Sequence, residues 1–171
     1  MKLLLSILEP GDEVLAPSPG YPIYESLTNF FGGEFKPYVF VEQEDRFEID
    51  LDYLKSLITP KTKLLIFNNY HNPTGWASSD HVMQEVAKLC VENDLWVLSD
   101  EAYFHITYRD TVGKSIASLP GMRERTVILL TASKSYSMVI FDNFLYFLHF
   151  LSELPLIRLD GELEQPLVHG S

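Results

Sequence analysis

The stretch Leu95-Trp-Val-Leu-Ser-Asp-Glu-Ala-Tyr103 decides the fold class, because an apolar run ends there on two adjacent carboxylates and an aromatic residue. Residues 95–99 have the length and composition of a strand that is buried on both faces, as in a parallel sheet. In open α/β sheets, ligands bind beyond the carboxyl ends of the strands, so Asp100 stands where a charged group would meet a bound molecule. An isolated acidic pair is more often a solvated loop, so this assignment depends on motifs elsewhere in the chain.

Strand-like and helix-like segments alternate along most of the sequence. Apolar spacing and end signals predict strands over residues 13–16, 35–41, 63–67, 95–99 and 126–130, with helices over 21–31, 50–58 and 79–90. Strands that alternate with helices imply βαβ units with right-handed crossovers. We therefore expect an α/β fold in which helices flank a mostly parallel sheet.

Length and composition limit the possible functions. The 171 residues fit one domain, and the formal net charge of -11 argues against binding to nucleic acid, which requires a basic surface. Cys90 is the single cysteine and cannot form an internal disulfide, which is typical of a reducing compartment such as the cytoplasm. Its place on the apolar face of a helix predicts a buried residue rather than a nucleophile.

Two apolar segments, residues 1–8 and 138–151, do not have the features of a targeting or membrane segment. Residues 1–8 lack the cleavage chemistry of a secretory leader, so we expect the last turns of a helix whose upstream half is absent, stopped by Pro10 and Gly11. Residues 138–151 are densely apolar and aromatic, but a membrane span needs about 20 apolar residues with few charges. We expect an apolar helix and a polar tail there, with no membrane association.

Polar residues follow three of the predicted strands. These strand ends are Asn69-Tyr-His-Asn-Pro-Thr-Gly75, Ser99-Asp-Glu-Ala-Tyr103 and Thr131-Ala-Ser-Lys134, and a parallel sheet brings them to the same edge. Their combination and order resemble the class I/II aminotransferases, which are pyridoxal-phosphate (PLP) enzymes of fold-type I. The resemblance covers about residues 8–138 and includes Glu-Pro-Gly-Asp-Glu-Val-Leu and Pro-Gly-Tyr-Pro-Ile-Tyr near the start.

The resemblance assigns the two central chemical roles to Lys134 and Asp100. Lys134 matches the lysine that forms a Schiff base with the cofactor and then moves a proton between the substrate carbon and the cofactor. Its amine must be partly deprotonated for this, so we expect desolvation or nearby cationic charge around it. Asp100 matches the acid that keeps the pyridine nitrogen protonated, which makes the ring an electron sink.

The same resemblance supplies the remaining cofactor contacts, and no metal site is expected. Asn72 and Tyr103 match the pair that hydrogen-bonds the phenolic oxygen of the ring, and Tyr21 matches an aromatic residue stacked on it. Thr131 matches a hydroxyl contact to the phosphate, with Ser133 as a second. We expect His71 to be a surface loop residue and Glu101 to be structural.

The sequence departs from the family pattern after Met138. The family continues with Thr-Gly-x-Arg-x-Gly, whose arginine binds the phosphate, whereas this chain continues Val-Ile-Phe-Asp-Asn-Phe-Leu. The upstream glycine turn for the phosphate and the distal domain with the arginine for the substrate carboxylate are not found either. We therefore expect residues 1–138 to be an incomplete PLP-binding large domain and residues 139–171 to be a divergent end that is unmatched to the family.

The resemblance implies a transaminase that moves an amino group between an amino acid and a 2-oxo acid, and the missing anchors predict impaired turnover. One alternative is an inactive remnant of such an enzyme, and another is a PLP-dependent carbon-sulfur lyase of the same fold. The family is expected to form a homodimer, but the missing segments contribute to that interface.

Overall fold

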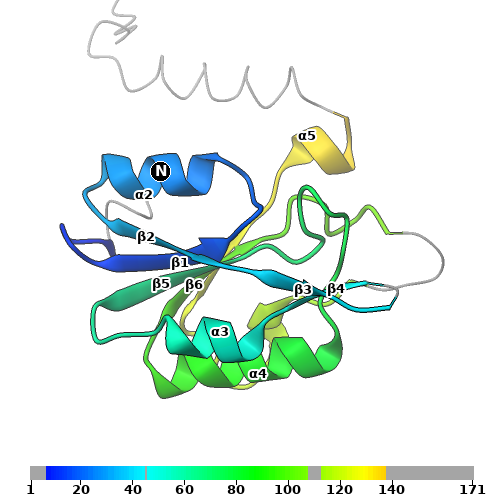
Figure 1. Ribbon diagram of the computed structural model, residues 1–171. Helices are drawn as coiled ribbons and strands as arrows, with labels where there is room; N and C mark the ends of the chain where they lie inside the picture. Colours follow the sequence, from blue (N-terminus) through cyan, green and yellow to red (C-terminus); the bar gives the residue numbers. More distant parts are fainter. Residues whose placement is uncertain (1–6, 45, 108–112, 138–171) are drawn as a thin grey trace, which may run out of the picture.

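The computed structural model describes residues 7–44, 46–107 and 113–137 (Figure 1). The helix end expected over residues 1–8 lies largely outside these residues. The apolar helix and tail expected over residues 139–171 lie wholly outside them, so the division of the chain at residue 138 stays a prediction.

Five parallel strands form the central sheet. In chain order they are β1 (Glu13–Pro17), β2 (Glu34–Tyr38), β5 (Thr62–Phe67), β6 (Trp96–Asp100) and β7 (Thr126–Leu129). Their order across the sheet is β2-β1-β5-β6-β7, and each neighbouring pair is parallel. The predicted mostly parallel α/β sheet is therefore confirmed, and β5, β6 and β7 lie side by side with their carboxyl ends at one edge.

Helices cover both faces of this sheet (Figure 1). Helix α2 (Ile23–Phe30) lies over one face, whereas α3 (Leu51–Ser56) and α4 (Asp80–Glu92) lie over the other. Helix α4 begins as the sequence predicts, because the Ser79 side chain accepts a hydrogen bond from the backbone N–H of Val82 at 3.3 Å. Two short helices, η1 (Ile116–Ser118) and α5 (Ala132–Ser135), flank β7 in the chain.

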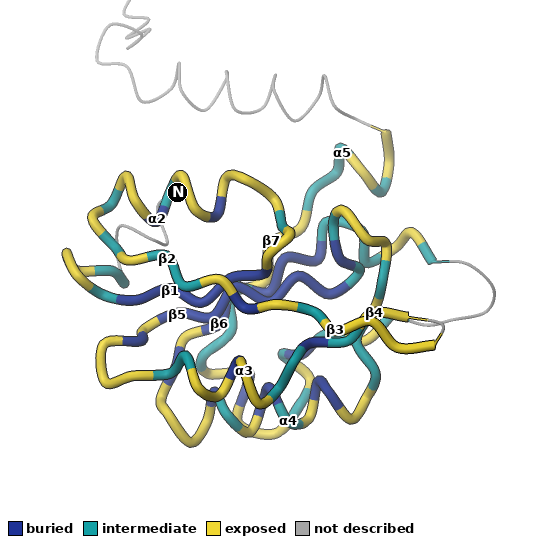
Figure 2. Tube along the Cα trace, in the orientation of Figure 1, coloured by how far each residue is buried: buried dark blue, intermediate teal, exposed yellow. Residues whose placement is uncertain are grey.

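The central strands β1 and β5 are buried on both faces of the sheet, as Figure 2 shows. Alternate residues of β1 enter different clusters: Val14 and Ala16 pack with Tyr24 of α2, and Leu15 packs with residues of α4. Cys90 belongs to the second of these clusters and is fully buried, as predicted. The two clusters fix the sheet between its helices and so fix the positions of the strand ends.

The strand predicted over residues 35–41 is interrupted at Val39. Strand β2 ends at Tyr38, which is paired with Pro17 at the end of β1, so the sheet offers no further partner along β1. The chain then leaves the sheet as β3 (Phe40–Glu42), which forms an antiparallel hairpin with β4 (Phe47–Ile49). The sequence reading missed this hairpin, which carries Phe40 to the loop after β5.

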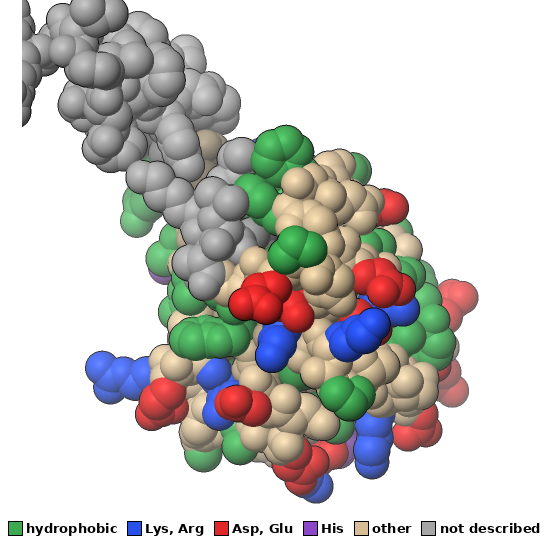
Figure 3. Space-filling model, turned by 90° about the vertical axis from the view of Figure 1, so that its left-hand side faces the viewer, with side chains coloured by type: hydrophobic (Ala, Val, Ile, Leu, Met, Phe, Trp, Pro, Cys, Tyr) green, Lys and Arg blue, Asp and Glu red, His purple; other side chains and the backbone are tan. Residues whose placement is uncertain are grey.

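Charged side chains of both signs are interspersed on the side of the molecule shown in Figure 3. The net charge of -11 is therefore not gathered there into one acidic patch. Among the described helices, none combines the length and the apolar character that crossing a membrane requires.

Candidate active site

One cavity of about 370 Å³ lies at the carboxyl ends of β5, β6 and β7. It collects residues from three loops that are far apart in sequence, because the parallel order of these strands brings their ends together. Asp100 and Lys134 open into this same cavity. All seven residues that the sequence marked as cofactor contacts line it: Tyr21, Asn72, Asp100, Tyr103, Thr131, Ser133 and Lys134.

Asp100 is held at both carboxylate oxygens. It is the last residue of β6 and is only 8% exposed. Oδ2 accepts a hydrogen bond from the hydroxyl of Tyr24 at 2.5 Å, and Oδ1 accepts one from the backbone N–H of Ala102 at 3.1 Å. Burial, together with the neighbouring Asp100 carboxylate, raises the pKa of Tyr24 well above its usual value, so its hydroxyl remains a donor.

Asn68 connects the acid to the neighbouring loop. Its side-chain amide donates to the backbone carbonyl of Asp100 at 3.0 Å, and its side-chain oxygen accepts from the backbone N–H of Asn72 at 3.0 Å. Asn68 is buried and lines the cavity, but the sequence reading did not mark it. Its position directly after the buried run of β5 was the available signal.

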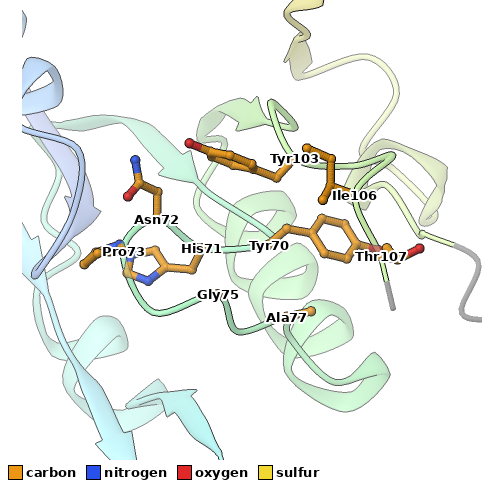
Figure 4. Close-up of a pocket in the computed structure, with 9 residues that line it drawn as sticks. All are labelled: Tyr70, His71, Asn72, Pro73, Gly75, Ala77, Tyr103, Ile106 and Thr107. Carbon is orange, nitrogen blue, oxygen red and sulfur yellow. The ribbon is translucent and has the colours of Figure 1, made fainter. Parts of the chain in front are cut away.

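Asn72 and Tyr103 separate the cavity from a second one of about 430 Å³, because both residues line both spaces. Figure 4 shows that the polar ends of the two side chains point to the same side, away from Tyr70 and Thr107 on the other wall. Two hydrogen-bonding groups can therefore be directed at one edge of a ligand.

Tyr21 supplies an accessible aromatic ring. Its side chain is 48% exposed and meets the buried ring of Tyr24 edge to face, with centroids 5.8 Å apart and planes at 83°. This contact positions the ring of Tyr21, and its exposed surface can pack against a flat ligand.

The segment after β7, formed by Thr131 and the short helix α5, carries two hydroxyls and the lysine. The Thr131 hydroxyl accepts from the backbone N–H of Ser133 at 3.2 Å, which caps α5 and orders the turn before Lys134. Lys134 is exposed, so the described part of the chain does not supply the desolvation expected for its amine.

His71 corrects one expectation, because it is 1% exposed and is not a surface loop residue. Its ring lies 4.4 Å from that of Phe40, between centroids, and Nδ1 lies 2.9 Å from the hydroxyl of Thr74. Burial lowers the pKa of His71, an effect partly opposed by the backbone carbonyl of Pro19.

Glu101, the second acid of the deciding stretch, is occupied by structural contacts. It is buried and accepts hydrogen bonds from the hydroxyls of Ser99 at 2.9 Å and Ser115 at 2.5 Å. These bonds join the end of β6 to the start of η1, and Glu101 is not among the residues that line the cavity.

Comparison with known proteins connects this geometry to a family. Residues 2–139 match the family model of aminotransferase class I and II. The chain is 42% identical over 136 residues to an aspartate aminotransferase from Pyrococcus abyssi, which covers 79% of this chain and 34% of that enzyme. It is 39% identical over 132 residues to an arginine–pyruvate transaminase from Pseudomonas aeruginosa, covering 77% of this chain and 33% of that enzyme.

The fold agrees with these sequence matches. N-succinyldiaminopimelate aminotransferase from Mycobacterium tuberculosis superposes with a TM-score of 0.74 at 34% identity, over 77% of this chain and 34% of that chain. The chain thus spans about a third of the length of the relatives that it matches. The match to the family model and the shared parallel sheet together show that this chain belongs to the aminotransferase class I and II family, with the fold-type I architecture.

Proposed function

We propose that this chain carries the PLP-binding part of an enzyme that transfers an amino group between an amino acid and a 2-oxo acid. The observation that carries the proposal is that Asp100 and Lys134 line one cavity, together with the five other residues marked from the sequence. Its volume of about 370 Å³ falls within the range of small-molecule sites, roughly 300–1,000 Å³.

The donors and acceptors in the cavity fit PLP. A buried carboxylate with both oxygens already held is suited to a protonated ring nitrogen, because burial penalises an acid that has no cationic partner. The amide of Asn72 and the hydroxyl of Tyr103 suit a phenolic oxygen, and the exposed ring of Tyr21 suits a flat heterocycle. When bound, PLP supplies an electron-withdrawing ring that stabilises negative charge on a substrate carbon.

The chain's own residues then have distinct tasks. Asp100 keeps the proton on the ring nitrogen, and Lys134 holds the cofactor through its Nζ and afterwards moves a proton to and from the substrate carbon. Asn72 and Tyr103 orient the phenolic oxygen. The hydroxyls of Thr131 and Ser133 hold the phosphate. The sequence that follows Met138 does not contain the family's Thr-Gly-x-Arg-x-Gly motif, whose arginine would also bind the phosphate.

Partners and location belong to the same proposal. The substrates are an amino acid and a 2-oxo acid, and the enzyme acts as a homodimer in the cytoplasm. The single cysteine, which cannot form an internal disulfide, supports a reducing compartment.

An absorbance titration of the full chain with PLP tests the proposal. We expect a new band from lysine-bound PLP in the wild type and in Lys114→Ala, and no such band in Lys134→Ala. Lys114 is a matched control because it is exposed and pairs with Asp80 at 2.5 Å. Adding an amino acid to the loaded wild type should then change the band as the amino group is taken up. The proposal fails if the wild type gives no band, or if the band survives in Lys134→Ala.

A further inference from the structure

Tyr24 lies in the candidate site, although the motif that it ends, Pro-Gly-Tyr-Pro-Ile-Tyr, predicts a cofactor contact for Tyr21 only. It comes from α2, lines the same cavity as Asp100, and is separated from that acid by 76 positions in sequence. Its ring is 6% exposed and packs in the cluster formed by β1, β5 and α2. The ring therefore belongs to the core, whereas its hydroxyl reaches the site.

The partner of this hydroxyl distinguishes Tyr24 from an ordinary core tyrosine. Tyr38 is also buried, but its hydroxyl donates to the backbone carbonyl of Ile66 at 3.0 Å and so serves the sheet alone. The hydroxyl of Tyr24 donates instead to a carboxylate oxygen at 2.5 Å, which is the short distance of a charge-assisted bond.

We propose that Tyr24 is a positioning residue that holds the Asp100 carboxylate in the orientation needed to pair with the PLP ring nitrogen. This inference rests on the proposed function. It assigns to α2 a role in the site in addition to the aromatic surface that Tyr21 provides just before this helix.

Two donors, one on each oxygen, determine how the carboxylate is turned. The backbone N–H of Ala102 holds Oδ1 and the hydroxyl of Tyr24 holds Oδ2, so rotation of the carboxylate would break at least one bond. Because burial and Asp100 itself raise the pKa of Tyr24, its hydroxyl keeps its proton and continues to donate.

Replacing Tyr24 with phenylalanine removes the donor and keeps the ring. The edge-to-face contact with Tyr21 and the packing of the ring against β1 and β5 are then retained. The variant therefore reports the effect of the hydroxyl alone. Tyr38→Phe is the matched control, since it also removes one buried phenolic hydroxyl but leaves the Asp100 carboxylate untouched.

The test measures dissociation constants of two ligands on the full chain. One is PLP, and the other is its carbocyclic analogue, in which CH replaces the ring nitrogen. The ratio of the two constants reports the Asp100 interaction and cancels effects on the phosphate, the phenolic oxygen or stacking. Wild type should prefer PLP by about tenfold or more, the size of one charge-assisted hydrogen bond, and Asp100→Asn should lose this preference.

Tyr24→Phe should reduce the preference at least about fivefold, while Tyr38→Phe keeps the wild-type ratio, because only the former removes a charge-assisted bond. If Tyr24→Phe weakens both ligands equally, or leaves the ratio unchanged, the inference is overturned and Tyr24 is structural. Should wild type bind neither ligand, the proposed function fails and the inference fails with it. A wild type that binds both equally overturns the inference and the role given to Asp100, because Asp100 then does not contact the nitrogen, whereas PLP binding by the chain is upheld.

Discussion

The side-chain amide of Asn68 donates a hydrogen bond of 3.0 Å to the backbone carbonyl of Asp100, and so ties the end of β5 to the end of β6. The oxygen of the same side chain accepts from the backbone N–H of Asn72 at 3.0 Å. One buried amide thus sets the spacing between the residue assigned to the ring nitrogen and the residue assigned to the phenolic oxygen.

Asn68→Ala should lower the free energy of unfolding by about 1–3 kcal/mol, because it leaves the buried carbonyl of Asp100 and the half-buried N–H of Asn72 without this partner. Urea denaturation measures the change. Asn93→Ala is the control: its amide also donates to a backbone carbonyl, that of Leu89 at 2.8 Å, but at an exposed helix end, where the loss should stay within about 0.5 kcal/mol. Equal losses of unfolding free energy in the two variants would show that the hydrogen bonds of Asn68 stabilise the fold no more than an exposed one does.

Tyr21→Ala should weaken PLP binding by about twofold to tenfold, the range expected for one aromatic contact. Tyr21→Phe keeps the ring and should bind nearly as well as wild type, since the structure gives the hydroxyl of Tyr21 no part in the fit. Fluorescence titration of both variants gives the comparison. A phenylalanine variant as weak as the alanine variant would assign the contact to the hydroxyl and not to the ring.

The buried His71 predicts a loss of stability in mild acid. Its pKa is lowered in the folded chain, so the unfolded chain takes up the proton first, at its ordinary pKa of about 6.5. The unfolded state then binds more protons, and the free energy of unfolding falls as the pH drops below that value. Stability curves from pH 8 to pH 5 should therefore be flatter for His71→Gln than for wild type.

His81→Gln, on the exposed side of α4, controls for the simple loss of an imidazole. The same decline in wild type and in His71→Gln would mean that His71 is protonated as readily in the folded chain as in the unfolded one.

Cys90 should resist thiol reagents in the folded chain. Burial raises the pKa of its thiol from 9.0 to about 12, which lowers the thiolate fraction about a thousandfold, and its side chain is fully buried. At pH 8, a chromogenic disulfide reagent should therefore label Cys90 completely when urea unfolds the chain. Without urea, the labelling should be no faster than unfolding. Rapid reaction of the native chain would contradict the packing of α4 on the sheet.

The sheet could be predicted because its signals are local. Buried runs such as residues 63–67 and 95–99 end on polar residues, and the alternation of strands and helices leaves few possible topologies. The strand prediction failed at Val39, where the run of aromatic and β-branched residues over 38–41 continues although the sheet partner does not. Residue pattern alone does not reveal that β3 changes partner to β4.

The residues of the site that belong to the family's motifs could be predicted from the sequence. The contacts that hold these residues in place could not. Tyr21 and Tyr24 lie three positions apart, and which of them meets Asp100 depends on how α2 docks on the sheet. The sequence predicts a surface position for His71, because this residue lies in a polar loop. The loop folds back on itself, with His71 and Trp76 joined by a backbone hydrogen bond of 2.7 Å, and Phe40 covers the ring.

The most direct measurement is to map the lysine that carries the cofactor. The full chain is loaded with PLP, reduced with borohydride so that the cofactor stays fixed to its amine, digested and analysed by peptide mass spectrometry. We predict that the pyridoxyl group is found on Lys134, which lies in α5 after β7 and lines the same cavity as Asp100. Labelling spread over exposed lysines such as Lys114, or no preference for Lys134, would contradict the account.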